Sequence, residues 1–225
     1  MKKKQILVIG LGQFGMGLIK ALSKKNVEVI GLDIDQKKVQ QASTYTDQVY
    51  CCDATDQDTL KQFNPSGRDV CICATGDQSK EAAIICTAIL KQMGATRVIA
   101  RANDDLHARI LTLVGADEVI NPEWAFGERF ANRVINEAIL EEMSLGSDLV
   151  VTEFRVPPHF SKKSILNLNL RRKFDMTVVA IRSAATGQVK LAQPEEILQE
   201  EDILIVVSRM DSVSRLLNDN LSSRG

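Results

Sequence analysis

The residues best suited to chemistry lie near the N-terminus, in the run Gly10-Leu11-Gly12-Gln13-Phe14-Gly15. This run matches the pattern G-x-G-x-x-G, follows a predicted strand and precedes a helical stretch, which is the context that the pattern requires. There the first glycine permits a tight turn, the second lets the backbone approach a pyrophosphate, and the third lets helix and strand pack closely. The unpaired N–H groups at the start of the helix can then bind phosphate without a lysine.

An acidic residue follows at the distance that this motif calls for. Asp33 ends the second predicted strand, about 20 residues beyond the glycines, where a carboxylate accepts hydrogen bonds from ribose hydroxyls and repels a 2′-phosphate. This favours NAD or an adenine nucleotide over NADP. The alternative is that Asp33 only caps the helix that starts near Gln36, which Asp35 could do equally well.

Two further strand ends are predicted to face the same crevice, because ligands of open α/β sheets bind beyond the carboxyl ends of the strands. These are Asp53-Ala54-Thr55 and Ala74-Thr75-Gly76-Asp77, whose small residues leave room for an adenosine. Asp53 could bond to base or ribose. Capping of the next helices by Thr55 or Asp77 is an equally good interpretation and is compatible with lining the pocket.

Short apolar runs alternate with amphipathic stretches in the first half of the chain, which predicts parallel strands joined by helices. The clearest helix is predicted from Asp77 to Met93. The fold class is therefore α/β, a Rossmann-type doubly wound parallel sheet. Its predicted strands are Gln5–Ile9, Glu28–Asp33, Gln48–Cys52, Asp69–Ala74, Arg97–Arg101 and Glu118–Ile120.

A long helix is predicted next, from Glu123 to Met143, with apolar residues at helical spacing that suit a crossover helix for dimerisation. From Ser147 onwards the pattern changes to short β segments, which indicates a second, smaller α+β lobe. We therefore expect an N-lobe over residues 1–145 and a C-lobe over residues 146–225. The C-lobe segments are Leu149–Val156, Thr177–Arg182, Val189–Ala192, Ile203–Ser208, a helix at Ser212–Leu217 and a tail, Asn218–Gly225, that is expected to fray.

Composition narrows the class of protein. With 28 basic and 29 acidic residues, the net charge of -1 offers no basic excess for nucleic acid. No apolar run reaches the roughly 20 residues that span a bilayer, so a cytoplasmic protein is expected. The five cysteines lack paired metal-ligand spacing, and four of them fall in two strands predicted to be buried, where cysteine packs as a small hydrophobe.

The sequence favours a binding protein over an enzyme. A dehydrogenase needs an acid or base beside the nicotinamide, commonly a histidine or lysine. The two histidines, His107 and His159, are read as surface or interface residues without a carboxylate partner. A small NAD-dependent oxidoreductase remains the alternative, on the strength of the same glycines and Asp33.

The whole chain resembles the cytoplasmic regulatory subunits of bacterial Trk and Ktr potassium uptake systems, which are built from a regulator-of-potassium-conductance (RCK) domain. The segments that carry the resemblance are Val8–Gly15, Leu32–Asp35, Asp53–Thr55, Gly115–Asp117, Asn121–Glu123 and Pro194–Leu198, followed by Asp202. The later segments, in this order and at these intervals, are the more specific ones.

The resemblance implies a homodimer that assembles into an octameric ring beneath a membrane-embedded Trk or Ktr transporter subunit. It also implies gating of the pore by exchange of ATP against ADP or of NADH against NAD. By position, the nucleotide site would comprise Gly10, Gly12, Gln13, Phe14, Gly15, Asp33, Ile34, Asp35, Asp53, Ala54, Thr55, Ala74, Thr75, Gly76 and Arg101. Arg101 would bind phosphate there, or it is a solvated charge at a strand end.

Three positions carry narrower expectations from the resemblance. Ktr-type relatives often have an arginine in place of Gln13 that reaches a terminal phosphate, so a neutral amide here favours ADP or NAD over ATP-specific sensing. Glu123 matches an acidic residue that helps to bind a divalent cation between N-lobes; by itself it is a first-turn helix acid. Ile165, Asn167 and Arg171 match a C-lobe stretch that binds cyclic di-AMP in some relatives and is otherwise a dimer interface.

Overall fold

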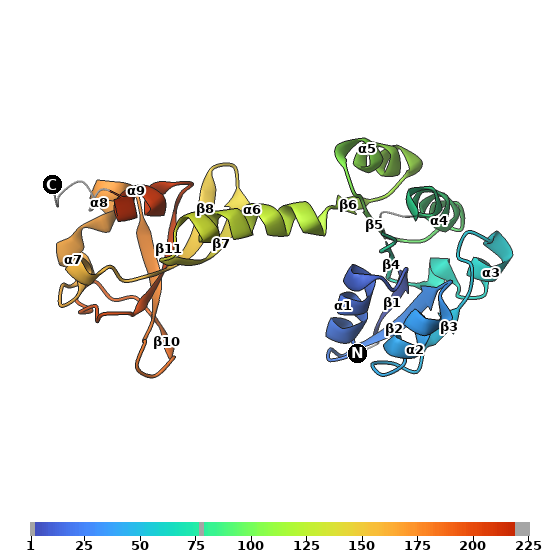
Figure 1. Ribbon diagram of the computed structural model, residues 1–225, viewed down its shortest axis with the longest axis horizontal. Coiled ribbons are helices and arrows are strands. Elements are labelled where there is room, and N and C mark those ends of the chain that lie inside the picture. The colour runs from blue at the N-terminus through green and yellow to red at the C-terminus, as the bar shows by residue number, and fades with distance from the viewer. Residues whose placement is uncertain (1–2, 77–78, 219–225) are drawn as a thin grey trace. The chain divides into compact units, whose positions relative to one another are not determined.

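The computed structural model describes residues 3–76 and 79–218, and the chain forms two compact units that divide between Glu123 and Trp124. Figure 1 labels their helices and strands. The first unit contains β1 (Lys4–Ile9), α1 (Gln13–Leu22), β2 (Val27–Asp33), α2 (Gln36–Ala42), β3 (Val49–Cys51), α3 (Gln57–Lys61), the 3-10 turn η1 (Pro65–Gly67), β4 (Val70–Cys73), α4 (Lys80–Gln92), β5 (Val98–Arg101), α5 (Asp105–Val114) and β6 (Glu118–Ile120).

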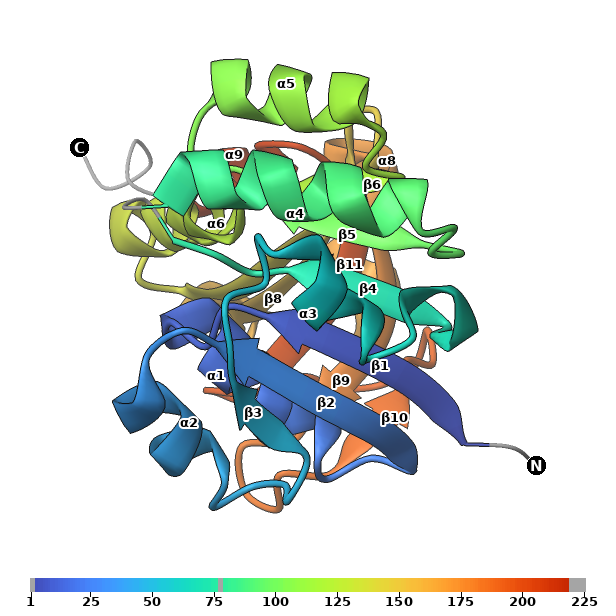
Figure 2. The ribbon, with the colours of Figure 1, turned by 90° about the vertical axis from the view of Figure 1, so that its right-hand side faces the viewer.

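The six strands of the first unit form one parallel sheet in the order β3-β2-β1-β4-β5-β6. Figure 2 shows β3, β2, β1 and β4 side by side in this order. The strand order reverses between β1 and β4, and in doubly wound sheets that switch point is where ligands bind. The predicted fold class and all six predicted strands are confirmed.

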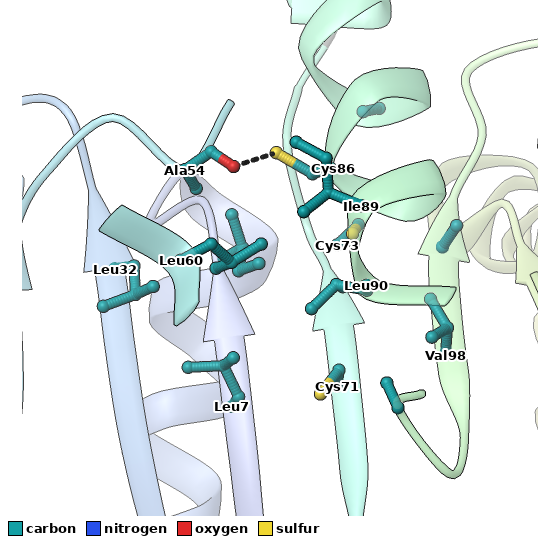
Figure 3. Packing of buried hydrophobic residues seen from close by; sticks show 14 of the residues in the cluster. Leu7, Leu32, Ala54, Leu60, Cys71, Cys73, Cys86, Ile89, Leu90 and Val98 are labelled. Atoms are coloured by element: carbon teal, nitrogen blue, oxygen red, sulfur yellow. Dashed lines mark hydrogen bonds between the residues drawn. The ribbon is translucent and has the colours of Figure 1, made fainter. Parts of the chain in front are cut away.

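The apolar side chains of the sheet alternate between two cores, as the pleat of a strand requires. Leu7 and Ile9 of β1 pack in one cluster with Leu60 of α3 and with Cys86 and Leu90 of α4. Figure 3 shows part of this packing. The intervening strand residues pack on the opposite face with α1 and α2, through Ile6, Val8, Ile19, Val39 and Ala42. Burial on both faces explains why these strands read as continuous apolar runs.

One expectation about burial is corrected by the sheet order. Cys71 and Cys73 on the central strand β4 are buried, but Cys51 is exposed and Cys52 is half-buried. The reason is that β3 is an edge strand, so one of its sides has no neighbouring strand. Burial raises the pKa of the Cys71 thiol to about 12 and that of Cys73 to about 11, which suits cysteines that pack as hydrophobes.

The second unit is an antiparallel sheet in the order β10-β9-β11-β8-β7, packed against short helices. Phe154, Leu198, Leu204 and Val206 are fully buried in its core. Its elements are most of α6 (Pro122–Ile135), then β7 (Ile139–Gly146), β8 (Leu149–Arg155), the 3-10 turn η3 (Pro158–Phe160), α7 (Ile165–Leu168), α8 (Leu170–Phe174), β9 (Thr177–Arg182), β10 (Val189–Leu191), β11 (Ile203–Arg209) and α9 (Ser212–Asn218).

The predicted helix from Glu123 to Met143 is wrong in its second half. The helix ends at Ile135, and residues 139–146 form strand β7, which pairs with β8. Apolar residues at Ile139, Met143 and Leu145 also fit the two-residue period of a strand, and pairing with β8 decided between the two patterns. The lobe boundary expected near residue 145 stays a prediction for the assembled protein. Residues 219–225 of the expected tail lie outside the described residues.

The placement of His107 on the surface is also wrong, because this side chain on α5 is only 3% exposed. Burial lowers the pKa of His107 from its ordinary value of 6.5; the charge of Asp104 opposes this shift, and the charge of Lys80 adds to it. The imidazole is therefore neutral at pH 7 in the folded protein.

We expect the free energy of unfolding to fall as the pH drops from about 7 towards 5. The unfolded chain takes up a proton at His107 near pH 6.5, whereas the folded chain resists it. His107→Leu should flatten this part of the pH profile, measured by thermal denaturation. His159→Gln is the matched control, since His159 is exposed. An unchanged profile in His107→Leu would contradict the assignment.

The two glycines of α1 supply a second test of packing. A Cβ at Gly15 would lie 1.9 Å from the carbonyl oxygen of Gly10, whereas a Cβ at Gly17 meets nothing within 4 Å. We expect Gly15→Ala to lower the free energy of unfolding by about 3 kcal/mol or more. Gly17→Ala should raise it by about 0.5 to 1 kcal/mol, as is usual in an exposed helix. Urea denaturation measures the free energy of unfolding of both variants and so distinguishes the steric contact at Gly15 from the effect of helix propensity. Equal changes in the two variants would refute the packing argument.

Candidate functional site

A cavity of about 730 Å³ lies at the carboxyl ends of the parallel strands. This volume is typical of a site for a small ligand or cofactor. The cavity is lined by Ile9, Gly10, Gly12, Gln13, Leu32, Asp33, Ile34, Lys38, Cys52, Asp53, Ala54, Thr55, Thr75, Gly76, Ser79, Ala82, Cys86, Arg101 and Glu123.

The glycine loop forms one wall of this cavity. Gly10 has φ +90°, a left-handed conformation that favours glycine, and a Cβ there would lie 2.9 Å from the backbone nitrogen of Thr75. Gly12 is different, because a Cβ at this position would point into open space. The absence of a side chain at Gly12 therefore leaves room in the cavity rather than relieving a clash.

The start of α1 can bind an anion. Gly12 is the N-cap residue and supplies no side-chain hydrogen bond to the first turn of the helix. The N–H groups of that turn therefore keep their capacity to donate to a ligand, and the helix dipole adds positive potential there. A phosphate group fits this end of the cavity.

Asp33 joins the end of β2 to the glycine loop. Its Oδ2 accepts a hydrogen bond from the backbone N of Leu11 at 2.6 Å, and its Oδ1 accepts one from the backbone N of Asp35 at 2.8 Å. The side chain is buried, and Lys38 Nζ lies 3.6 Å from Oδ2. Each carboxylate oxygen retains a second lone pair for a ribose hydroxyl.

The structure shows which acidic residue at the end of β2 caps the next helix and which one lines the cavity. Asp35 caps α2, because its carboxylate accepts a hydrogen bond from Lys37 N at 2.9 Å. Asp33 does not cap that helix. The residues after β3 also divide into a helix cap and a residue of the cavity. Asp56 caps α3 by accepting a hydrogen bond from Thr59 N, whereas Asp53 accepts two hydrogen bonds from Thr55. These bonds lower the pKa of Asp53, which is therefore ionised at neutral pH.

The far end of the cavity holds an ion pair. Arg101 Nη2, at the end of β5, donates to Glu123 Oε1 at 2.7 Å. Arg101 is buried, and its Nε and the Thr75 hydroxyl have no hydrogen-bond partner among the residues that the structure describes. Arg101 is therefore not a solvated strand-end charge.

Some of the residues expected at the site do not line the cavity. Phe14, Gly15, Asp35 and Ala74 lie beside it, with Gly15 and Ala74 buried in the packing between α1 and the sheet. Sequence reasoning overlooked Lys38, Ser79, Ala82, Cys52 and Cys86 as lining residues. Lys38 and Ala82 lie on helices, where helical periodicity is the only sequence signal for a residue that faces the cavity. Cys52 was expected to pack as a small hydrophobe in a buried strand.

The C-lobe stretch proposed for a second ligand lies on two short helices. Asn167 on α7 and Arg171 on α8 are exposed, and Ile165 packs against the core of the second unit. The backbone N–H of Ile165 donates a hydrogen bond to the carbonyl of Glu196, and that of Leu166 donates to the carbonyl of Pro194. This stretch and the segment Pro194–Leu198 therefore lie side by side.

Among residues 3–76 and 79–218 there is no group of three or more His, Cys, Asp or Glu side chains that could hold a metal ion. In the same residues, no helix is long and apolar enough to cross a membrane.

The fold and the cavity define a two-unit protein whose first unit is a Rossmann-type domain with a cavity at the carboxyl ends of its strands. A family model described as the TrkA-N domain matches residues 6–122, and one described as the TrkA-C domain matches residues 151–219. The chain therefore belongs to the Trk and Ktr potassium uptake family, as the resemblance indicated.

Relatives of similar length share both units. The chain is 32% identical to Ktr system potassium uptake protein C of Bacillus subtilis (strain 168) over 215 residues, which are 95% of this chain and 96% of that protein. It is 31% identical to Ktr system potassium uptake protein A of Vibrio alginolyticus over 214 residues, 95% of this chain and 96% of that protein. The GsuK RCK domain has a similar fold, with a TM-score of 0.55 at 24% identity over 97% of this chain and 46% of that one.

The carboxylates after β2 supply a test of the site. Asp33→Asn removes the charged acceptor that the carboxylate offers to a ribose hydroxyl, and hydrogen bonds to charged groups contribute about 1.5 to 3 kcal/mol. We expect the affinity for ADP or NAD to fall by about tenfold to a hundredfold. Asp35→Asn is the control, because asparagine caps a helix as well as aspartate does. Calorimetry measures the nucleotide affinity of both variants. Equal losses of affinity would show that Asp33 has no role in binding beyond that of Asp35.

Proposed function

We propose that this protein is a cytoplasmic, nucleotide-sensing regulatory subunit of a membrane-embedded Trk or Ktr potassium transporter. The observation that carries the proposal is the cavity formed by the glycine loop, the start of α1 and Asp33, in a chain that belongs to a potassium uptake family. Binding of a nucleotide at this cavity would change the shape of an assembly of several chains and so bias transport.

The chemistry of the cavity favours an adenine nucleotide or NAD(H). The helix start suits a pyrophosphate, and the acidic groups at Asp33 and Asp53 suit hydroxyl and base donors. One structure with a similar fold is described as a GsuK channel bound to NAD, with a TM-score of 0.54 at 24% identity. Gly10, Gly12, Gln13, Asp33, Ile34, Asp53, Ala54, Thr55, Thr75, Gly76 and Arg101 are the lining residues that we assign to the nucleotide.

We assign the site to sensing and not to catalysis. Neither histidine, His107 on α5 or His159 in the turn η3, is among the residues that line the cavity. A ligand regulates by binding one shape of the protein more tightly than another, and no bond in the ligand has to break.

The proposed assembly is a homodimer joined through α6 that builds an octameric ring. An apolar stripe of Phe126, Phe130 and Val134 on this helix is exposed in the single chain, and the two phenylalanine rings stack 5.7 Å apart. A stripe of this kind suits burial against a second copy. A divalent cation at Glu123 would need ligands from that second copy, and cyclic di-AMP near Ile165, Asn167 and Arg171 remains a separate prediction.

Calorimetry with NAD, NADH, ADP and ATP tests the proposal. The decisive variant is Gly12→Leu, because a side chain there enters the cavity without meeting the protein within 4 Å of its Cβ. We expect the wild type to bind at least one of the four nucleotides and Gly12→Leu to lose about tenfold or more in affinity. Gly17→Leu, on the exposed side of α1, is the control. Wild-type protein that binds none of the nucleotides would overturn the proposed function.

A further inference from the structure

The wall of the cavity beside Asp33 carries a cation. Lys38 of α2 lines the cavity, and its Nζ lies 3.6 Å from Asp33 Oδ2. The aspartate side chain is 6% exposed, whereas the lysine side chain is 43% exposed. Because an ammonium group has three N–H donors, Lys38 can still donate to a ligand that enters this end of the cavity.

The packing of α2 holds Lys38 at this wall. Val39 and Ala42 are buried in the core between α2 and the sheet, and Asp35 caps the start of the helix. Figure 2 shows α2 beside β2 and β3. These contacts fix the rotation of the helix, so that Lys38 is half-buried while Lys37 is exposed. Of these two adjacent lysines, only Lys38 lines the cavity.

Charges of both signs therefore meet at this end of the cavity. Asp33 and Asp53 supply two carboxylates, and Lys38 supplies a positive charge. A phosphate carried by the ribose of a bound nucleotide would be repelled by the two acids and attracted by the lysine. Discrimination against such a phosphate thus depends on Lys38 as well as on Asp33.

The ion pair with Asp33 leaves Lys38 free to turn towards a phosphate. A separation of 3.6 Å is longer than a hydrogen bond, and ion pairs with a solvent-exposed partner contribute little. Asp33 keeps its hydrogen bonds from Leu11 N and Asp35 N when the lysine moves. A bond from an ammonium group to a phosphate oxygen is charge-assisted and stronger than the contact that it replaces.

We propose that Lys38 is a specificity-determining residue, which lets the cavity accept adenosine nucleotides that carry a phosphate on the ribose. NADP belongs to this class of ligand. The inference rests on the proposed nucleotide-binding function, with the adenosine ribose at Asp33. The two carboxylates still favour NAD, and Lys38 limits the size of that preference.

Calorimetry with NAD and NADP on Lys38→Gln tests the proposal. The two ligands differ by one phosphate on the adenosine ribose, so the ratio of their affinities isolates the contact with that phosphate. We expect Lys38→Gln to weaken the binding of NADP by about tenfold or more and to change that of NAD by less than about threefold. Lys38→Arg keeps the positive charge and should retain the binding of NADP.

Lys37→Gln is the matched control. It removes the same charge from the neighbouring residue of the same helix, and Lys37 does not line the cavity. The control therefore measures the general effect of net charge on the binding of an anion. We expect it to leave the ratio of NAD to NADP affinity unchanged. Thermal denaturation of the lysine variants checks that they are folded alike.

The outcomes separate this inference from the proposed function. If the wild type binds NAD and Lys38→Gln leaves the affinity ratio unchanged, or if Lys37→Gln shifts it equally, the role of Lys38 is overturned. A wild type that binds ADP but neither dinucleotide, or that binds NAD about a thousandfold more tightly than NADP, overturns it as well. If the wild type binds no nucleotide at all, the proposed function fails and this inference fails with it.

Discussion

The first unit depends on a close approach between two backbone segments, the turn at Gly10 and the start of α1 at Gly15. No side chain fits between them, because a Cβ at Gly15 would overlap the carbonyl oxygen of Gly10. This contact brings the helix start over the end of β1. Asp33 then bonds to Leu11 and ties the same loop to the end of β2. The start of α1 and the carboxylate of Asp33 are thereby held at one cavity.

Charge inside that cavity is arranged in two regions. Near β2 and β3, the carboxylates of Asp33 and Asp53 accept hydrogen bonds from backbone and hydroxyl donors. At the end of β5, the buried Arg101 is paired with Glu123 of α6. A buried charge without a partner is strongly unfavourable, so the carboxylate of Glu123 stabilises Arg101 in this wall of the cavity.

Several segments that mark the family serve the fold rather than the ligand. Gly115 ends α5 with φ +112°, and Asp117 accepts a hydrogen bond from Val98 N, which connects the starts of β5 and β6. Asp202 is buried in the second unit and accepts hydrogen bonds from Ala184 N and Gln199 N in two separate turns. A carboxylate that satisfies backbone donors in this way cannot be replaced by an apolar residue without leaving them unpaired.

The sequence alone determined the parallel sheet, its six strands and the motif at Gly10 to Gly15. Strands buried on both faces require continuous apolar residues, and the turn before α1 requires glycine, so both features can be recognised from the local residue types. It also singled out Asp33, whose position after β2 follows from the length of one helical crossover. It did not determine where α6 ends, since the residues after it fit both helical and strand periods and pairing with β8 decided between them. Nor did it reveal the exposure of Cys51, the burial of His107 or the pairing of Arg101 with Glu123. Each of these depends on which element lies next to which, and residues distant in the chain become neighbours only when the sheet assembles.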